Sequence, residues 1–380
     1  GGAAGLVSYA GQSVTIDNVN CTGGLNINGK NEVAGFVAHS ANSITINNSS
    51  IENENINSTN NWAGGFVAYA GQAATLSYVK CTGNLNVNGY SETGGFVGRA
   101  ANTITITNSG IEKGTINSSD SNAGGLIGYT GADSSLSNIT FGNSDANKED
   151  LNSEFHVQSN GKSIQKASAG GLIARAGGVP TIKDVHFNVK LTVENTNDAI
   201  SNANEDAVGG LIGFANAKVY VKDTSIKNGT VQSIGTRAGG FVGAANNEVD
   251  IKNSKINSGI ITSITDRAGG LLAFANQVAT VDSVNCNSLI VTGKSTSGGF
   301  LGFSQQKVTI QNSEFNNCTV LSTNDHAGGL IAQGSNVTIS NVNITGNISV
   351  TAKMAAGGFV GYNTDNTISV LNSSIHSAVV

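Results

Sequence analysis

The chain has little of several things that most globular proteins contain. Its 380 residues include one proline (Pro180), one tryptophan, one methionine and four cysteines. Charged residues make up only 12%, with a formal sum of −5, so there is no basic stripe of the kind that binds nucleic acid. No run of 18 apolar residues exists, which argues against a membrane-spanning helix. The chain opens with Gly1-Gly2 and no methionine, which favours a processed product or a fragment.

A helical period is lacking as well. Apolar residues alternate with polar ones in short runs, such as 6–10, 14–16 and 25–27, and do not recur every 3.6 residues. Short alternating runs bounded by Gly and Asn are typical of β-strands. The sequence therefore predicts an all-β protein.

What the chain does have is glycine, 50 residues of it, placed with a fixed period. A glycine pair (Ala-Gly in the first two copies) is followed by two large apolar residues and usually a small one, twelve times. Its second member is Gly5, Gly35, Gly65, Gly95, Gly125, Gly171, Gly210, Gly240, Gly270, Gly299, Gly329 and Gly358. The intervals are 29 or 30 residues, apart from one of 46 and one of 39. Such a period indicates one supersecondary unit stacked on itself.

We therefore predict a parallel β-helix, or β-solenoid, with three short strands in each coil of about 30 residues and about twelve coils. Residues 1–380 would form one continuous body, with long loop insertions at about 142–168 and 195–206. Coils that stack at a strand spacing of ~4.8 Å give a rod ~58 Å long. Backbone pairing between coils would then stabilise a polar sequence that has no wide core.

Two columns support this register. The second strand of each coil carries an inward column that runs from Ile16 and Ile46 to Val370, and an Asn-rich column follows two residues later. Asn tolerates left-handed backbone angles at corners, and stacked amides bond one another. A second period is superimposed: a Val-x-Cys type of coil, as at Val19, alternates with an Asn-Ser-x-Ile type, as at Asn48. The duplicated unit was therefore a pair of coils.

A threonine ladder is expected on the outside of the second strand. Its members are Thr15, Thr45, Thr75, Thr105, Thr181, Thr280, Thr309 and Thr338. Flat Thr arrays on solenoids meet ice in some antifreeze proteins, but Tyr220 and Asp250 interrupt this one. A β-branched residue also simply suits an exposed strand.

A second expected surface is an apolar assembly ridge on the strand after the glycine pair. Its column would be Val7, Val37, Val67, Val97, Ile127, Ile173, Ile212, Val242, Leu272, Leu301, Ile331 and Val360. The column two residues later includes Arg99, Arg175 and Gln333 and is therefore expected outside, and strand alternation then places the ridge outside as well. The alternative is a kink after the glycine pair that turns both apolar columns inward.

The two long insertions carry several acidic residues, which are weak candidates for a cation or partner site. They are Asp145, Glu149, Asp150, Glu154, Asp198, Glu205 and Asp206. Loops on a rigid stack are where solenoids place specificity. A tolerated excursion is the alternative, and no metal ligand is assigned.

Catalytic chemistry is not expected. The five histidines, at positions 39, 156, 186, 326 and 376, are scattered, and the sequence shows no nucleophile–base pair, no metal-ligand spacing and no phosphate-binding loop. Cys21, Cys81 and Cys286 lie in a core column, and Cys21 and Cys81 are two coils apart, ~9.6 Å, too far for a disulfide. Cys318 is offset from Cys286. We expect no enzyme activity and no cofactor.

The glycine motif resembles the GLUG-type repeats of bacterial surface adhesins, and similar repeats occur in surface proteins of protists. The resemblance covers all twelve copies but rests on a short motif. It implies an extracellular or cell-surface β-solenoid that works in adhesion or as a fibre shaft, with no catalytic residues to carry over. Partners would be further copies or a longer parent chain, and host or cell-surface glycans or proteins. The alternatives are a carbohydrate- or ice-binding module and, third, a polysaccharide-active enzyme.

The two ends of the sequence favour assembly. The chain starts near a glycine pair and stops after a third strand, without a recognisable cap. Open solenoid edges join other strands unless they are covered. We therefore expect head-to-tail continuation of the rod, together with lateral packing through the ridge.

Overall fold

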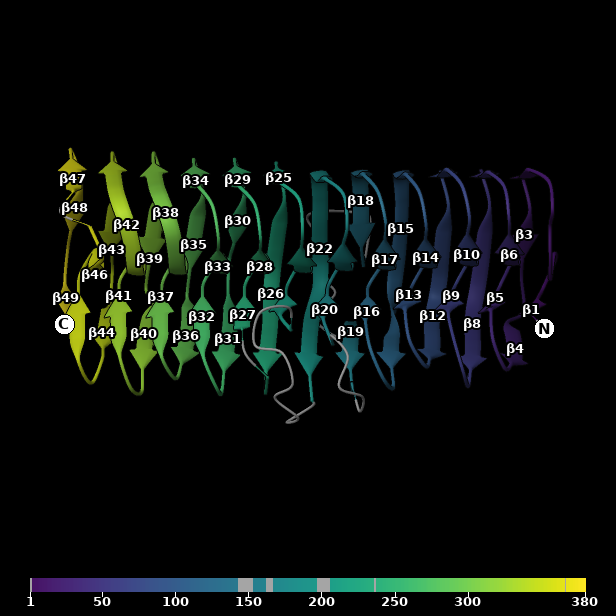
Figure 1. The fold of residues 1–380 in the computed structure, drawn as a ribbon, viewed down its shortest axis with the longest axis horizontal. Helices are drawn as coiled ribbons and strands as arrows, with labels where there is room; N and C mark the ends of the chain where they lie inside the picture. The colour runs from purple at the N-terminus through teal and green to yellow at the C-terminus, as the bar shows by residue number, and fades with distance from the viewer. Residues whose placement is uncertain (1, 143–152, 162–166, 197–205, 236, 366) are drawn as a thin grey trace.

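The computed structural model describes residues 2–142, 153–161, 167–196, 206–235, 237–365 and 367–380. In these residues every regular element is a β-strand, and every strand pair is parallel. Successive coils stack along one axis, and the two ends of the chain lie at opposite ends of a rod (Figure 1). Pairing advances by one coil at each step, as from Val37 to Val67 to Val97. The predicted parallel β-solenoid is confirmed.

Each coil contributes to four ladders, one more than expected. The added one, the glycine ladder, consists of two- and three-residue strands before the bend of the glycine pair and forms its own sheet. Its strands are β1 (Ala3–Ala4), β5 (Val33–Ala34), β9 (Ala63–Gly64), β13 (Thr93–Gly94), β16 (Ala123–Gly124), β20 (Ala169–Gly170), β23 (Val208–Gly209), β27 (Arg237–Gly239), β32 (Arg267–Gly269), β37 (Thr296–Gly298), β41 (His326–Gly328) and β45 (Ala355–Gly357).

The valine ladder follows the glycine pair. Its strands are β6 (Val37–Ser40), β10 (Val67–Ala70), β14 (Val97–Ala100), β17 (Ile127–Thr130), β21 (Ile173–Ala176), β24 (Ile212–Ala215), β28 (Val242–Ala245), β33 (Leu272–Ala275) and β46 (Val360–Asn363), with β38 (Leu301–Gln311) and β42 (Ile331–Ser340), which continue into the next ladder.

The threonine ladder comes third. Its strands are β2 (Val14–Asp17), β7 (Ile44–Asn47), β11 (Ala74–Ser77), β25 (Val219–Lys222), β29 (Val249–Lys252), β34 (Ala279–Asp282) and β47 (Ile368–Leu371), together with the later parts of β38 and β42. Three more, β15 (Ile104–Ser118), β18 (Ser134–Phe141) and β22 (Pro180–Asn195), begin here and run on into the fourth ladder.

The fourth, the long-strand ladder, closes the coil. Its other strands are β3 (Asn20–Cys21), β4 (Leu25–Gly29), β8 (Ser50–Ser58), β12 (Lys80–Gly89), β19 (Glu154–Ser159), β26 (Ser225–Ser233), β30 (Lys255–Ile256), β31 (Gly259–Ser263), β35 (Asn285–Asn287), β36 (Leu289–Gly293), β39 (Glu314–Asn316), β40 (Thr319–Ser322), β43 (Asn343–Thr345), β44 (Ile348–Thr351), β48 (Ser374–Ile375) and β49 (Ala378–Val379).

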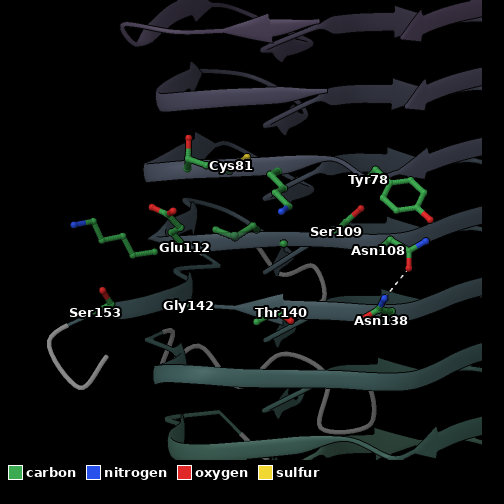
Figure 2. Close-up of a pocket in the computed structure, with 14 residues that line it drawn as sticks. Tyr78, Cys81, Asn108, Ser109, Glu112, Asn138, Thr140, Gly142 and Ser153 are labelled. Atoms are coloured by element: carbon green, nitrogen blue, oxygen red, sulfur yellow. Dashed lines mark hydrogen bonds between the residues drawn. The ribbon is translucent and has the colours of Figure 1, made fainter. Parts of the chain in front are cut away.

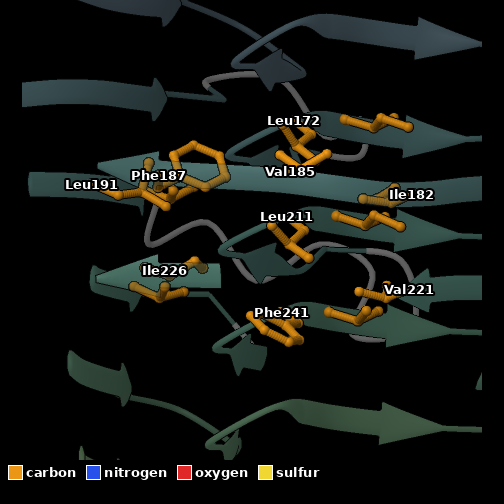
Figure 3. Close-up of a cluster of buried hydrophobic side chains, with 14 of the residues drawn as sticks. Leu172, Ile182, Val185, Phe187, Leu191, Leu211, Val221, Ile226 and Phe241 are labelled. Carbon is orange, nitrogen blue, oxygen red and sulfur yellow. The ribbon is translucent and has the colours of Figure 1, made fainter. Parts of the chain in front are cut away.

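The main core lies inside the last three ladders and runs the length of the rod as columns of like residues. Figure 3 shows a section in which Leu172, from the bend at the glycine pair, Ile182, from the threonine ladder, and Phe187, from the long-strand ladder, lie among other buried side chains. The predicted inward column is buried throughout the inner coils, as Ile339 shows with no exposed surface. Val370, at the same place in the last coil, is 41% exposed.

The glycine pair makes the chain double back. A Cβ on Gly64 would lie 1.9 Å from the carbonyl oxygen of Val67, and a Cβ on Gly65 would lie 2.1 Å from that of Gly95, so neither position has room for a side chain. The backbone bends at Gly65 and Phe66. Because this bend interrupts strand alternation, Phe66 and Val67 both point inward and are fully buried.

The predicted exposure of the assembly ridge is therefore wrong, and the kink is what the structure contains. The column is buried in the ten inner coils, at Val37, Val67, Val97, Ile127, Ile173, Ile212, Val242, Leu272, Leu301 and Ile331. Val7 and Val360, in the end coils, are half-buried and pack on the same core. On its other side the valine ladder is covered by the glycine ladder. The two ladders approach so closely that a Cβ on Gly98 would lie 2.7 Å from the carbonyl oxygen of Ala63. A small residue is required for that close approach.

A seam of aromatic and basic side chains runs along the edge where these two ladders meet. The rings of Tyr9, His39 and Tyr69 stack in succession at centroid distances of 5.1 and 4.7 Å, and Trp62 stacks on Tyr69 at 4.6 Å. Farther along, Phe214 and Phe274 are buried in a second small apolar cluster. Tyr9 belongs to the column two residues after the predicted ridge, which also holds Arg99 and Arg175 and was expected to face solvent. Tyr9 is exposed, Arg99 is half-buried and Arg175 is buried, so the column faces solvent only in part.

Every coil turns the same corner after its threonine-ladder strand. One residue there has a left-handed backbone, with φ between 46° and 57° in all twelve coils. The twelve are Asn18, Asn48, Tyr78, Asn108, Asn138, Asp184, Asp223, Asn253, Ser283, Asn312, Asn341 and Asn372. The prediction that Asn occupies a left-handed corner is confirmed. Stacked amides also bond along the axis, as from Asn138 Nδ2 to Asn108 Oδ1 at 2.7 Å.

The residue after the corner explains the two-coil repeat. In five coils it is a serine whose hydroxyl accepts a hydrogen bond from a backbone N–H of the preceding coil, and in the sixth coil Val185 takes its place. Val19 N donates to Ser49 Oγ at 3.1 Å and Val79 N donates to Ser109 Oγ at 3.1 Å. The same bond reaches Ser254, Ser313 and Ser373. The donor is a valine in four of these five bonds and Thr224 in the fifth, and each bond ties a coil to the Ser-type coil that follows it.

Candidate functional site

The outside of this corner is hollowed in two separate stretches of the rod, which together we call the groove. Both stretches lie between the column of left-handed residues and the first residues of the long-strand ladder. Two hollows of about 740 and 470 Å³ are lined by these two columns. We call the first the wide part of the groove and the second the narrow part.

The wide part spans the coils around β12, β15 and β18 and is shown in Figure 2. Tyr78 stands at one rim with 58% of its surface exposed, and Gly110 leaves the floor without a side chain. Lys80 and Lys113 also line it, and neither ammonium has an ion partner in the part of the chain that the structure describes. The wide part can therefore offer a ring, amides, two cations and the carboxylate of Glu112 to a polar ligand.

The narrow part contains a hydrogen-bonded trio of side chains. Ser225 Oγ and His186 Nδ1 are 2.8 Å apart, and His186 Nε2 and Asp184 Oδ1 are 2.9 Å apart. The side chains of His186 and Asp184 are 40% and 48% exposed. Lys255 follows Ser225 in the ladder. A serine hydroxyl within hydrogen-bond distance of an imidazole is a pairing that the spacing of the sequence did not predict.

Chain spacing had concealed this pair. His186 and Ser225 are 39 residues apart, because a long connection enlarges this coil, and a search at the 30-residue period does not align them. The backbone pairs them directly, β22 with β26. His186 follows Gly171, and Ser225 follows Gly210, by the same number of residues. This equal spacing from the glycine pair is the feature of the sequence that predicts their pairing.

The threonine ladder is in register, as predicted. Thr15 pairs with Thr45, Thr45 with Thr75 and Thr75 with Thr105. The remaining members, Thr181, Thr280, Thr309 and Thr338, lie on the same ladder, with Tyr220 and Asp250 between them in the column. All are half-buried or exposed. The array is flat and polar, but Tyr220 and Asp250 interrupt it at two successive coils, and Ser135 stands between Thr105 and Thr181.

The acidic residues of the two insertions are not brought together into a site by the described part of the chain. Asp145, Glu149, Asp150, Asp198 and Glu205 lie outside the described residues. Glu154 accepts hydrogen bonds from Lys190 Nζ and Thr192 Oγ1 at 3.2 and 3.0 Å, and these bonds lower the pKa of its carboxyl despite the opposing effect of desolvation by burial. Asp206 is buried and accepts a bond from Ala167 N at 2.8 Å. Both described carboxylates are engaged within the fold.

The aromatic seam does not offer a stacking platform. His39 lies between Tyr9 and Tyr69, and Tyr69 lies between His39 and Trp62. Because stacking covers both faces of these two rings, only their edges are left for solvent. Arg99 lies 4.5 Å from the centroid of Tyr129 and continues the column. The seam therefore stabilises the rod along its length.

All four cysteines are free thiols, as expected. Burial raises the pKa of Cys318 to about 12 and the pKa values of Cys81 and Cys286 well above their usual range, so these thiols are unreactive. Sequence reasoning missed one buried charge, Glu54 in the long-strand ladder. It is 2% exposed, neither carboxylate oxygen has a hydrogen-bond partner among the described residues, and desolvation raises its pKa well above the usual value.

In the described residues, no three His, Cys, Asp or Glu side chains are placed to hold a metal ion. The same part of the chain has no helix that could span a bilayer. The fold defines the class of this protein, a parallel β-solenoid built from repeats. Comparison with known proteins gave no match among family models, curated proteins or solved structures.

Proposed function

We propose that this protein is a structural rod that works outside the cell, as a segment of a surface fibre or as the shaft of an adhesin. The observation that carries the proposal is the unbroken one-coil register from β1 to β49, with the same core columns throughout. A body in which each coil packs only on its neighbours has length and stiffness as its main properties. The resemblance to GLUG-type repeats supports a surface location.

The end faces support continuation of the rod. Ile368 and Val370 are 49% and 41% exposed in the last coil, whereas Val337 and Ile339, one coil earlier in the same columns, are fully buried. Leu6 is 46% exposed at the other end. The end coil of a second copy, stacked on this one, would bury these side chains and pair the open strand edges.

Sedimentation velocity of the purified chain over a hundredfold concentration range, with electron microscopy of the same samples, tests this proposal. We expect elongated particles that lengthen with concentration while their width stays constant. Val370→Lys should abolish the lengthening, and Ser369→Lys, on the outward face of the same strand, should not. Compact particles, or rods of one length at every concentration and for both variants, would contradict end-to-end assembly.

A second candidate, a glycan-binding module, is favoured by the wide part of the groove. Tyr78 has an exposed ring there, and Lys80 and Lys113 lie within the same hollow. Aromatic rings with nearby hydrogen-bonding groups suit sugars, and the ammonium groups suit acidic ones. Binding to a panel of neutral and uronic-acid oligosaccharides, measured by calorimetry, should weaken in Tyr78→Ala. It should persist in Tyr220→Ala, which removes a ring that is 38% exposed elsewhere on the rod. No binding by the unmodified chain, or equal loss in both variants, would rule this candidate out.

A further inference from the structure

Three successive coils place a base, a hydroxyl and a cation side by side in the narrow part of the groove. The backbone pairs His186 with Ser225 and Ser225 with Lys255, as β22 pairs with β26 and β26 pairs with β30. Adjacent strands are ~4.8 Å apart. The three side chains therefore belong to one column on the outside of the rod, with Ser225 in the middle.

The hydrogen bonds of the trio fix the protonation that nucleophilic catalysis needs. Asp184 accepts at 2.9 Å from Nε2 of His186, which places the ring proton on that nitrogen. In the neutral imidazole the other nitrogen, Nδ1, then accepts from the hydroxyl of Ser225, 2.8 Å away. A hydroxyl bonded to a basic nitrogen whose far side is held by a carboxylate is the arrangement that activates serine in hydrolases on unrelated folds.

In other coils the serine of this column is hydrogen-bonded to an asparagine, and that bond has a structural role only. Ser50 Oγ donates to Asn20 Oδ1 at 2.7 Å, and Ser374 Oγ donates to Asn343 Oδ1 at 2.9 Å. Those amide oxygens hold a serine in place but cannot take its proton. At Ser225 the partner is a histidine instead, and a carboxylate orients it. The substitution of an amide by a base changes the chemistry and keeps the geometry.

The surroundings suit a reaction at Ser225. The hollow of about 470 Å³ is lined by polar residues only. Ser225 is 7% exposed at its wall, beside the half-exposed side chain of His186, so a ligand in the hollow meets the hydroxyl at a narrow opening. Lys255 lines the same hollow, and its ammonium has no ion partner among the described residues. A cation next to the nucleophile stabilises the negative charge that develops on a carbonyl oxygen under attack.

We propose that Ser225 is the nucleophile of an esterase site, with His186 as general base and acid, Asp184 as its positioning residue and Lys255 as the oxyanion partner. Ser225 Oγ attacks the carbonyl carbon of a carboxylic ester and its proton passes to His186 Nδ1. The ester C–O bond breaks, and the leaving alcohol takes that proton. Water, deprotonated in turn by His186, then releases the acid and restores Ser225.

The substrate class follows from the lining of the narrow part. Hydroxyl, amide, carboxylate and ammonium groups surround Ser225, and no apolar pocket for a long acyl chain is present among the residues that line it. The site suits a short acyl ester, such as an acetyl group, on a polar polyhydroxyl chain lying along the groove. This activity is additional to the proposed role as a rod.

The test uses two probes, a fluorophosphonate, which traps activated serines, and p-nitrophenyl acetate. We expect one fluorophosphonate adduct per chain, located on Ser225 by peptide mass spectrometry, and acetate-ester hydrolysis that falls at least ~100-fold in Ser225→Ala and in His186→Asn. The second variant recreates the Asn–Ser pair of other coils and should fold normally.

Two controls separate this site from general surface reactivity. His156 is also bonded to a carboxylate, Glu194 at 3.0 Å, so His156→Gln should leave both signals unchanged. Ser50 should remain unlabelled. The proposal is overturned if the unmodified chain forms no adduct, if Ser225 is labelled equally in His186→Asn, or if ester hydrolysis survives Ser225→Ala.

Discussion

A left-handed residue at every corner disturbs the regular ladder, and single serine hydroxyl groups compensate for it in five of the coils. The N–H of Val79 has the Oγ of Ser109 as its acceptor, and that hydroxyl donates in turn to Thr107 O at 2.7 Å. Ser109 is only 5% exposed, so water does not replace it. One oxygen atom thus links two coils at a point where the backbone alone would leave a donor buried.

Removal of that oxygen should be costly. In Ser109→Ala the buried N–H of Val79 loses its acceptor, so the stability of the rod should fall by about 1–3 kcal/mol. Urea denaturation followed by circular dichroism measures the effect. Ser135→Ala, which changes an exposed residue one coil later, is the matched control and should shift the midpoint little. Equal midpoints for the two variants would show that the serine bond contributes nothing.

Glu54 makes the stability of the first coils depend on pH. Its pKa is raised in the folded chain, so between the usual carboxyl pKa near 4.5 and the folded value only the unfolded chain gives up the proton. Stability should therefore fall as pH rises above 4.5, by about 1.4 kcal/mol per pH unit until the folded value is passed.

Glu54→Leu, which matches Leu25 and Leu85 on the neighbouring coils, should remove this dependence and stabilise the rod at pH 7.5 by about 2 kcal/mol. Urea midpoints at pH 4.5 and 7.5 test both statements. Glu52→Gln changes a partly exposed carboxylate on the same strand and should leave the slope with pH unaltered. A variant at Glu54 that is less stable than the parent at pH 7.5 would contradict the account.

At the scale of elements, the bend at the glycine pair decides which columns are buried. It lets the glycine ladder fold back over the valine ladder, so that this strand is covered on both sides. A Cβ on Gly95 would lie 2.1 Å from the carbonyl oxygen of Gly125, in the next coil. That contact is with backbone, which cannot rotate away, and the same conflict recurs in most coils.

Gly95→Ala should therefore destabilise the rod by about 3 kcal/mol, because the coils on either side must move apart. Thermal melting measures this. In Gly235→Ala the nearest atom to the new Cβ would be 3.6 Å away, so this control should be neutral or slightly stabilising. A melting temperature for Gly95→Ala equal to that of the control would show that the stack can accommodate the side chain.

The sequence predicted which residues stack on one another from coil to coil, but it did not predict the direction in which the backbone turns between one strand and the next. The period of the glycine pair, the inward column from Ile16 to Val370 and the left-handed asparagines follow from spacing and residue chemistry. The inward turn of Val67 did not, because a glycine pair permits many backbone directions and alternation was assumed to continue through it. The groove was missed for a related reason: His186 and Ser225 meet only after a long connection has changed the interval.

At the scale of the whole molecule, the two-coil unit predicts which deletions the rod tolerates. Removal of residues 19–78 takes out two coils and leaves Val79 followed by Ser109, so the serine bond survives. Removal of residues 49–78 takes out one coil and leaves Val19 followed by Val79, which has no hydroxyl to offer. Both deletions keep the register and both remove Glu54.

We expect the shorter chain, with two coils removed, to be the more stable of the two. Denaturation midpoints compared at equal concentration provide the measurement, and small-angle scattering should show both chains as rods of unchanged width. A single-coil deletion that is at least as stable as the double one would mean that the pairing of coils reflects ancestry alone.

The direction of the ladder hydrogen bonds has a mechanical consequence. They lie along the long axis of the rod, so a force applied at its two ends loads one coil boundary after another instead of shearing all of them together. Most coils free 29 or 30 residues when they peel away, or about 100 Å of extended chain, and the two enlarged coils free 46 and 39. Single-molecule stretching should give a series of steps, most of them of about 100 Å and two of them longer, and one step for the whole rod would contradict it. Under load the rod would behave as an extensible tether that lengthens coil by coil while the remaining stack stays folded.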